Sequence, residues 1–245
     1  MFRLILGLFL LPAAALTLLT SIRILGHLAL SEPSAWPFAV GVLTAAALCL
    51  LGYAAEGRPQ GPAALGGRLA RWLYVFGHEL THAFAAWSLG AKVHDMEVAC
   101  DGGHVDLSRT GVFISLAPYC VPIYTVLVVL TARILMWLCP GRVDWRLFLG
   151  LVGLTLAGHL LMTAQSLWRR RQPDLLSAGG RIFSLSIIGA ANGLFMMILA
   201  KALFPRSVWL FSSLREVVLS TAGFWTWGHD FCRHFMGAGA PGGLG

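Results

Sequence analysis

A His-Glu-x-x-His motif is the part of this chain whose residue types and spacing could do chemistry. His78 and His82 are four residues apart, so on a helix they share one face and their imidazoles can bind one zinc ion. Glu79 points aside and could act as a general base toward a zinc-bound water. The motif therefore predicts a catalytic zinc site. The alternative interpretation is a pair of helix histidines whose hydrogen bonds are satisfied by neighbouring groups.

A catalytic zinc takes three protein ligands and leaves one position for water, so a third ligand must come from elsewhere. The candidates are Asp174, His159, His104, His94 and Glu97. If their helices run parallel, His159 and His78 lie at a similar depth, within a turn or so at about 1.5 Å per residue. Asp174 lies beyond its span and would have to reach that depth through a re-entrant or unwound segment. Residue spacing leaves both alternatives open.

Composition indicates an integral membrane protein. The chain of 245 residues is 57% hydrophobic and 12% charged, about half the charged fraction of a soluble domain. We expect one membrane-embedded unit over residues 1–245, with a core at about 69–204 and no separate soluble domain. The net charge of +7 comes from basic residues at the ends of apolar runs. Such residues are typical of membrane topology signals, and the absence of a basic patch argues against nucleic-acid binding.

Apolar runs predict an all-α membrane protein with about six transmembrane helices. The runs cover residues 4–21, 36–55, 69–90, 111–138, 147–168 and 182–204. The first is interpreted as a retained span rather than a signal peptide. Pro118 and Pro122 are expected to kink the fourth. Residues 207–227 are apolar but broken by Arg215 and Glu216, which predicts a C-terminal interfacial helix.

The polar stretch after the histidine motif predicts a small β-hairpin. Residues 92–98 and 104–107 alternate apolar and polar side chains on either side of a turn-forming Asp101-Gly102-Gly103. One interpretation is an ordinary solvent-exposed hairpin. The other is an edge strand that holds an extended peptide beside the metal.

The motif and its surroundings resemble a known family. Residues 76–86, Phe-Gly-His-Glu-Leu-Thr-His-Ala-Phe-Ala-Ala, followed by Gly90-Ala91-Lys92-Val93, are similar to the active-site helix of site-2-protease-type intramembrane zinc metalloproteases, the M50 peptidase group. That group typically shows Gly-x-x-Val and a membrane-associated hairpin after the helix. Residues 115–118, Ser-Leu-Ala-Pro, loosely match a later span of the group. The resemblance covers roughly residues 71–182.

In that group an aspartate before a Gly-Gly-Arg-like run supplies the third zinc ligand. Asp174, ahead of Gly179-Gly180-Arg181, is the nearest match in this chain. The resemblance therefore implies His78, His82 and Asp174 as zinc ligands, with His159 as the alternative third ligand. The Asn-x-x-Pro-x-Pro pattern that the group usually carries is absent here.

The resemblance implies hydrolysis of a peptide bond in a membrane-associated or transmembrane substrate, within the lipid bilayer and with zinc as cofactor. Asn192, Gln165 and the hairpin are candidates to line a water channel. A multi-pass protein of this compact design is compatible with a bacterial inner membrane, where we expect it. One alternative is a catalytically inactive scaffold that binds membrane segments, which the presence of Glu79 argues against. Another is a metal-dependent transporter, which the absence of inverted repeats argues against.

Overall fold

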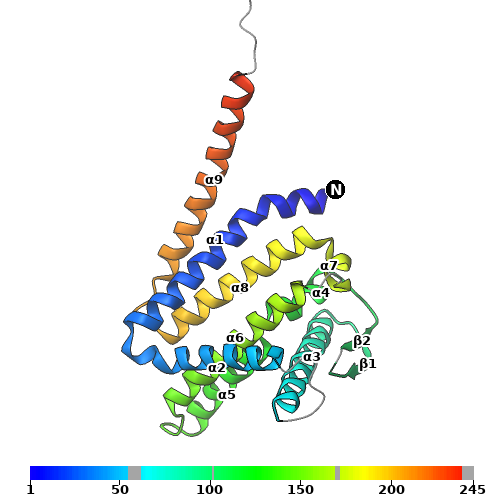
Figure 1. Ribbon diagram of the computed structural model, residues 1–245, viewed down its shortest axis with the longest axis vertical. Helices are drawn as coiled ribbons and strands as arrows, with labels where there is room; N and C mark the ends of the chain where they lie inside the picture. The colour runs from blue at the N-terminus through cyan, green and yellow to red at the C-terminus, as the bar shows by residue number, and fades with distance from the viewer. Residues whose placement is uncertain (55–61, 101, 169–171, 239–245) are drawn as a thin grey trace, which may run out of the picture.

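The computed structural model describes residues 1–54, 62–100, 102–168 and 172–238. In these residues the chain is mostly helical and carries one two-stranded sheet (Figure 1). The elements in chain order are α1 (Phe2–Ser31), the 3-10 helix η1 (Pro33–Ala35), α2 (Trp36–Ala54), α3 (Pro62–Ser88), β1 (Val93–Val98), β2 (Gly103–Leu107), α4 (Val112–Cys120), α5 (Ile123–Leu138), α6 (Trp145–Trp168), α7 (Pro173–Ala178), α8 (Arg181–Leu203) and α9 (Leu210–Ala238).

Four helical segments in the described residues are long and apolar enough to cross a membrane. They are Phe2–Ser31, Pro33–Gly52, Trp145–Trp168 and Arg181–Leu203. The bent pair α4 and α5 meets the same criteria when it is taken as one span. The helix of the histidine motif, α3, was predicted as a span over 69–90 but is not among them. These helices indicate a membrane protein, and the count of six spans stays a prediction.

The chain bends by 69° between α4 and α5. Val121 is extended at the break, and its N–H donates to the Ala117 carbonyl at 2.9 Å. Pro122 follows and has no N–H to continue the α4 ladder, which explains why the helix ends here. The sequence predicted a kink at both prolines. The break lies at Pro122, whereas Pro118 stays inside α4.

Two helix pairs form the body of the molecule, α1 with α8 and α2 with α6 (Figure 1). Both pairs approach closely at glycines. A Cβ on Gly7 of α1 would lie 2.7 Å from the Phe183 backbone, and a Cβ on Gly153 of α6 would overlap the Phe38 carbonyl. Small residues at such crossings let backbones pack closely, which is how membrane helices associate without a hydrophobic driving force.

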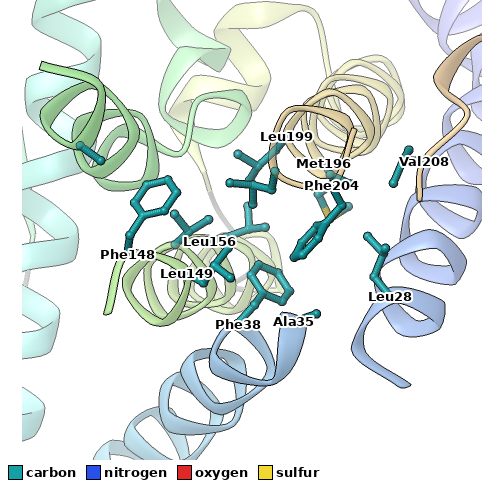
Figure 2. Close-up of a cluster of buried hydrophobic side chains, with 14 residues drawn as sticks. Leu28, Ala35, Phe38, Phe148, Leu149, Leu156, Met196, Leu199, Phe204 and Val208 are labelled. Carbon is teal, nitrogen blue, oxygen red and sulfur yellow. The ribbon is translucent and has the colours of Figure 1, made fainter. Parts of the chain in front are cut away.

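A cluster of buried apolar side chains joins the two pairs (Figure 2). Its largest members come from α2, α6 and α8: Phe38, Phe148, Leu149, Leu156, Met196 and Leu199. Leu28 of α1 closes one side, and Phe204 and Val208 follow α8. This packing fixes α6 and α8, and the short helix α7 lies between them in the chain.

The predicted hairpin is confirmed: β1 and β2 form an antiparallel sheet in which Glu97 pairs with His104 and Val98 with Gly103. The expected alternation of apolar and polar residues holds in β2 and in β1 from Asp95 onward, but it is interrupted at His94 and Asp95, which are both exposed, where the register shifts between Val93 and Asp95. Asp101 of the predicted turn lies outside the described residues. Both strands contact α3, so the hairpin lies against the helix that carries the histidine motif (Figure 1).

The C-terminal helix is longer than predicted. It runs from Leu210 to Ala238 and projects beyond the other helices, where the sequence predicted 207–227 (Figure 1). Trp225 stacks on Phe9 of α1 with ring centroids 5.0 Å apart. This aromatic contact holds α9 to the body of the molecule. A position at the membrane interface stays a prediction.

Candidate metal centre

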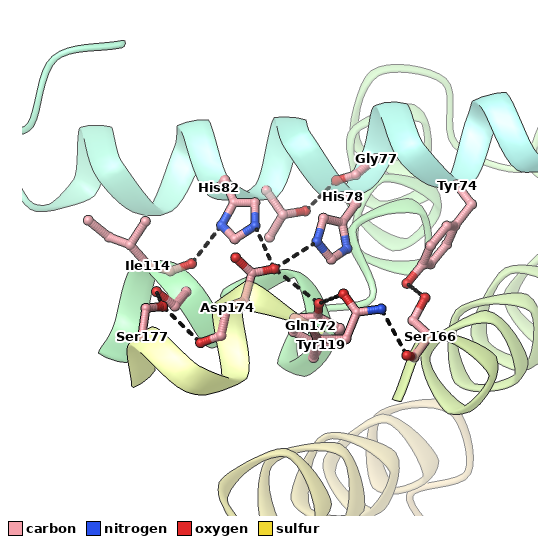
Figure 3. Close-up of polar contacts among 12 residues, drawn as sticks. Tyr74, Gly77, His78, His82, Ile114, Tyr119, Ser166, Gln172, Asp174 and Ser177 are labelled. Carbon is pink, nitrogen blue, oxygen red and sulfur yellow. Dashed lines mark hydrogen bonds and ion pairs between the residues drawn. The ribbon is translucent and has the colours of Figure 1, made fainter. Parts of the chain in front are cut away.

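Helix α3 presents His78 and His82 on one face, one turn apart (Figure 3). Their ring centroids are 5.0 Å apart with an interplanar angle of 78°. Thr81 lies between them, and its hydroxyl donates to the Gly77 carbonyl at 2.6 Å. That bond satisfies the hydroxyl within α3. Thr81 therefore does not compete with the two imidazoles for a ligand.

Asp174 completes a cluster of three metal-type donors from the first turn of α7. Its Oδ2 lies 3.6 Å from Nε2 of His78 and 3.6 Å from Nε2 of His82. All three donor atoms lie within 4.8 Å of one another. Figure 3 shows the carboxylate below α3, pointing between the two rings.

The spacing of these atoms fits a metal ion better than direct bonds. A charge-assisted N–H···O bond is about 2.7–2.9 Å long, shorter than the observed 3.6 Å. Two ligands about 2.0–2.1 Å from a tetrahedral zinc lie roughly 3.3–3.4 Å apart. The two distances from Asp174 to the histidines are thus close to the separation of two ligands of one ion. Two imidazoles and one carboxylate suit zinc and also other divalent transition metals.

The hydrogen bond of His82 orients its ring for metal binding. Its Nδ1 lies 2.8 Å from the Ile114 carbonyl, to which it can only donate. The neutral ring then carries its lone pair on Nε2, the atom that faces Asp174. Nδ1 of His78 is buried and has no hydrogen-bond partner among the described residues. The His78 ring instead packs against the edge of Tyr119, with centroids 4.9 Å apart.

Helix α4 holds Asp174 in place. The Tyr119 hydroxyl, which is fully buried, lies 3.0 Å from Asp174 Oδ2 and 3.3 Å from Gln172 Oε1. The Ser177 hydroxyl donates to the Asp174 carbonyl at 2.9 Å, so Ser115 must be the donor in the 2.9 Å bond between the two serines. The side chain and the backbone of Asp174 are therefore both tied to α4.

Two glycines let α7 end and the chain turn into α8. Gly179 and Gly180 have φ values of +125° and +102°, a region that side chains rarely tolerate. Leu175 and Ala178 are buried against α4 and α8, which packs the short helix into the bundle. Asp174 was expected to need a re-entrant or unwound segment. A six-residue helix between two long helices carries it to the histidines.

The surroundings of Asp174 favour the ionised form of its carboxylate. Burial by itself opposes ionisation, but the neighbouring His78 and His82 imidazoles outweigh it and hold the pKa of Asp174 well below its ordinary value. The ionised form is the one in which a carboxylate can bind a cation.

Glu79 lies beside the cluster, 8% exposed and packed against β2. A Cβ on Gly103 would lie 2.6 Å from Glu79 Cγ and 2.7 Å from Val75 Cγ1, so the strand touches the helix here. Among the residues that the structure describes, no hydrogen bond to the Glu79 carboxylate is found. The three metal-type side chains and Glu79 line one cavity of about 500 Å³. The carboxylate is thus positioned to accept a proton from a group in that cavity.

His159, the alternative third ligand, lies outside the cluster. Its Nε2 is 3.2 Å from Oδ1 of Asn192, whose amide donates to the carbonyls of Tyr119 at 2.7 Å and Ile188 at 2.9 Å. Asn192 was a candidate to line a water channel, but it is buried and fully bonded at the α4 bend. The Tyr119 carbonyl is at the end of α4, where the helix no longer supplies a partner.

The other candidates lie on the hairpin. His104 lines the cavity without joining the three donors, whereas His94 and Glu97 are exposed on β1. Gln165, the second candidate for the channel, lines the cavity.

The sequence reasoning missed Tyr119 and Ser177, which position Asp174. Tyr119 lies between Pro118 and Pro122. The two prolines predicted a break in the helix, but they gave no indication that the tyrosine has a role. Its contact with Asp174 joins residues separated by 55 positions. A contact of that kind has no local signal.

No protein-family model, curated protein or solved structure matches this chain. The resemblance to site-2-type proteases therefore rests on the residues of α3 and its neighbours. What this protein does has to be argued from the geometry of the site.

Proposed function

We propose that this protein is an intramembrane zinc metalloprotease that hydrolyses a peptide bond of a membrane-associated or transmembrane substrate. One observation supports the proposal most: two imidazole nitrogens and a carboxylate oxygen lie within 4.8 Å of one another, with Glu79 beside them in the same cavity. Three protein ligands and an open position are typical of catalytic zinc, whereas structural zinc is enclosed by four.

The proposed ligands are His78, His82 and Asp174. Bound zinc supplies a Lewis acid that polarises a substrate carbonyl and acidifies water. Glu79 then accepts the proton of the attacking water on its carboxylate and delivers it to the leaving amine. Its lack of another partner among the described residues supports this role. Tyr119 keeps Asp174 oriented, and the Ile114 carbonyl keeps the proton of His82 on Nδ1.

The substrate has to reach this site as an extended segment. In a helix the carbonyl is already hydrogen-bonded and surrounded by backbone, so a transmembrane substrate must unwind before attack. The cavity is bordered by the hairpin residues Gly102, Gly103 and His104. An unwound peptide can therefore lie in this cavity beside the hairpin while its carbonyl faces the three ligands.

The proposal is tested by separating metal binding from cleavage. Detergent-solubilised protein loaded with zinc is incubated with a proteome-derived peptide library, and new N-termini are identified by mass spectrometry. Glu79→Gln should keep about one zinc per chain and lose at least 100-fold in cleavage, because it keeps the shape but loses the base. Glu97→Gln, on the exposed strand β1, is the matched control and should cleave like the wild type.

Other outcomes identify the alternatives. Wild-type protein with full zinc and no new termini would contradict the protease and favour the scaffold. Zinc flux into vesicles that depends on a gradient would favour the transporter. Equal cleavage by Glu79→Gln and the wild type would remove Glu79 from the mechanism.

A further inference from the structure

A second cavity, of about 360 Å³, is also lined by His78, and no hairpin residue is among its described lining residues. It is bounded by α2, α3, the α4–α5 break and α6. We refer to it as the apolar cavity. No step proposed above uses it.

Most of the residues that line this cavity are apolar. Three hydroxyls among its lining residues are satisfied within the protein, whereas Nδ1 of His78 has no hydrogen-bond partner among the described residues. Thr81 donates to the Gly77 carbonyl, Thr155 to the Leu151 carbonyl and Tyr124 to the Leu73 carbonyl. Since hydroxyls bonded in this way need no further partner, the cavity suits an apolar group.

Small residues on facing helices make the space. Gly52 of α2 and Gly67 of α3 meet where the two helices cross, and a Cβ on Gly67 would lie 3.4 Å from the Gly52 Cα. On α6, a Cβ on Gly158 would meet no atom within 4 Å. Gly158 therefore faces open space, and a larger side chain there would extend into the apolar cavity without moving the backbone.

The apolar cavity shares a wall with the cavity of the metal centre. His78 lines both cavities, and so do Arg71, Tyr74, Met162 and Gln165. A peptide whose carbonyl lies at the metal centre thus has a neighbouring side chain within reach of the apolar cavity. A cavity on the order of 150 Å³ already holds a benzene ring, so the apolar cavity has room for an aromatic or branched side chain.

From this shared wall we infer that the apolar cavity is the specificity subsite of the peptide bound at the metal centre and that it receives a large apolar side chain next to the scissile bond. The inference rests on the proposed function. It adds that cleavage sites are selected by an aliphatic or aromatic residue, which membrane segments supply in abundance.

The test uses peptide hydroxamates, which chelate zinc and carry Ala, Leu or Phe as the neighbouring residue. Zinc-loaded wild-type protein should bind the Leu and Phe compounds about 10- to 100-fold more tightly than the Ala compound, because only they fill the cavity. Gly158→Phe should abolish this difference while keeping zinc and the affinity for the Ala compound. Gly158→Ala should lose part of the preference for the Leu and Phe compounds over the Ala compound.

The matched control is Gly26→Phe on α1, where a Cβ also meets no atom within 4 Å. It should keep the full preference. Wild-type affinity that does not depend on the side chain, or a preference that survives in Gly158→Phe, would overturn the subsite and leave the protease proposal in place. A phospholipid that copurifies with the wild type, but not with Gly158→Phe, and blocks the Leu compound would assign the cavity to an acyl chain. If zinc is bound and no hydroxamate binds, the proposed function fails and the subsite with it.

Discussion

At the scale of residues, the Asp174 side chain is oriented by the Tyr119 hydroxyl. This hydroxyl is 3.0 Å from Oδ2, the oxygen that faces both imidazoles. Asn192 in turn holds the Tyr119 carbonyl at the end of α4. A buried asparagine thereby fixes the tyrosine that fixes the carboxylate. Such supporting residues commonly affect metal affinity without touching the metal.

We predict that Tyr119→Phe weakens zinc binding about tenfold, because the ring and its packing stay while the donor to Oδ2 is lost. Competition with a chromophoric chelator measures the dissociation constant. Tyr124→Phe is the matched control. Tyr124 packs on Gly77 of α3, the helix that carries His78 and His82, but its hydroxyl donates to the Leu73 carbonyl and not to Asp174. Unchanged affinity in Tyr119→Phe would mean that α7 alone positions Asp174.

At the scale of elements, features with a local cause could be predicted from the sequence. The hairpin follows from alternation on either side of a turn, and the α4–α5 break follows from a missing N–H at Pro122. The span predicted over 69–90 has a weaker basis, since Arg71, His78, Glu79 and His82 lower the apolarity of that run. The structure has one helix there, and it is not among the candidate spans.

The meeting of α3 with α7 could not be predicted in the same way. It depends on α4, which binds Asp174 through Tyr119 and joins Ser177 through Ser115. Depth along the predicted helices made His159 a competitor of Asp174. Depth alone does not tell which way a side chain points, and His159 bonds to Asn192.

The fit of the hairpin against α3 leads to a prediction at adjacent glycines. A methyl group at Gly103 would collide with Glu79 Cγ, whereas one at Gly102 would meet no atom within 4 Å. Neither glycine has a positive φ, so alanine is allowed by the backbone at both. Gly103→Ala should displace the Glu79 side chain and lower peptide cleavage about tenfold or more with zinc content unchanged. Gly102→Ala should cleave like the wild type.

Both variants are assayed with the same peptide library and for zinc content. Loss of zinc in Gly103→Ala would show that the hairpin supports the ligands rather than the base. Equal cleavage by the two variants would mean that the strand moves aside easily.

At the scale of the whole molecule, the metal centre joins parts that the chain builds separately. His78 and His82 come from α3, which packs on α2, α4 and the hairpin, whereas Asp174 comes from α7, which packs on α4 and α8. An ion bound by all three would link α3 directly to α7. Metal binding should therefore contribute to the stability of the whole fold.

We predict that zinc at about 1,000 times its dissociation constant adds roughly 4 kcal/mol to the free energy of unfolding. A ligand that binds only the folded state stabilises it, and the midpoint of thermal unfolding should rise by roughly 10 °C. Asp174→Ala should lose this rise, because one of three ligands is gone. His159→Ala should keep it, because His159 bonds to Asn192 outside the cluster. The measurement compares each variant with and without zinc in detergent, so that any cost of the substitution itself cancels. The reverse pattern, with the rise lost in His159→Ala and kept in Asp174→Ala, would make His159 the third ligand.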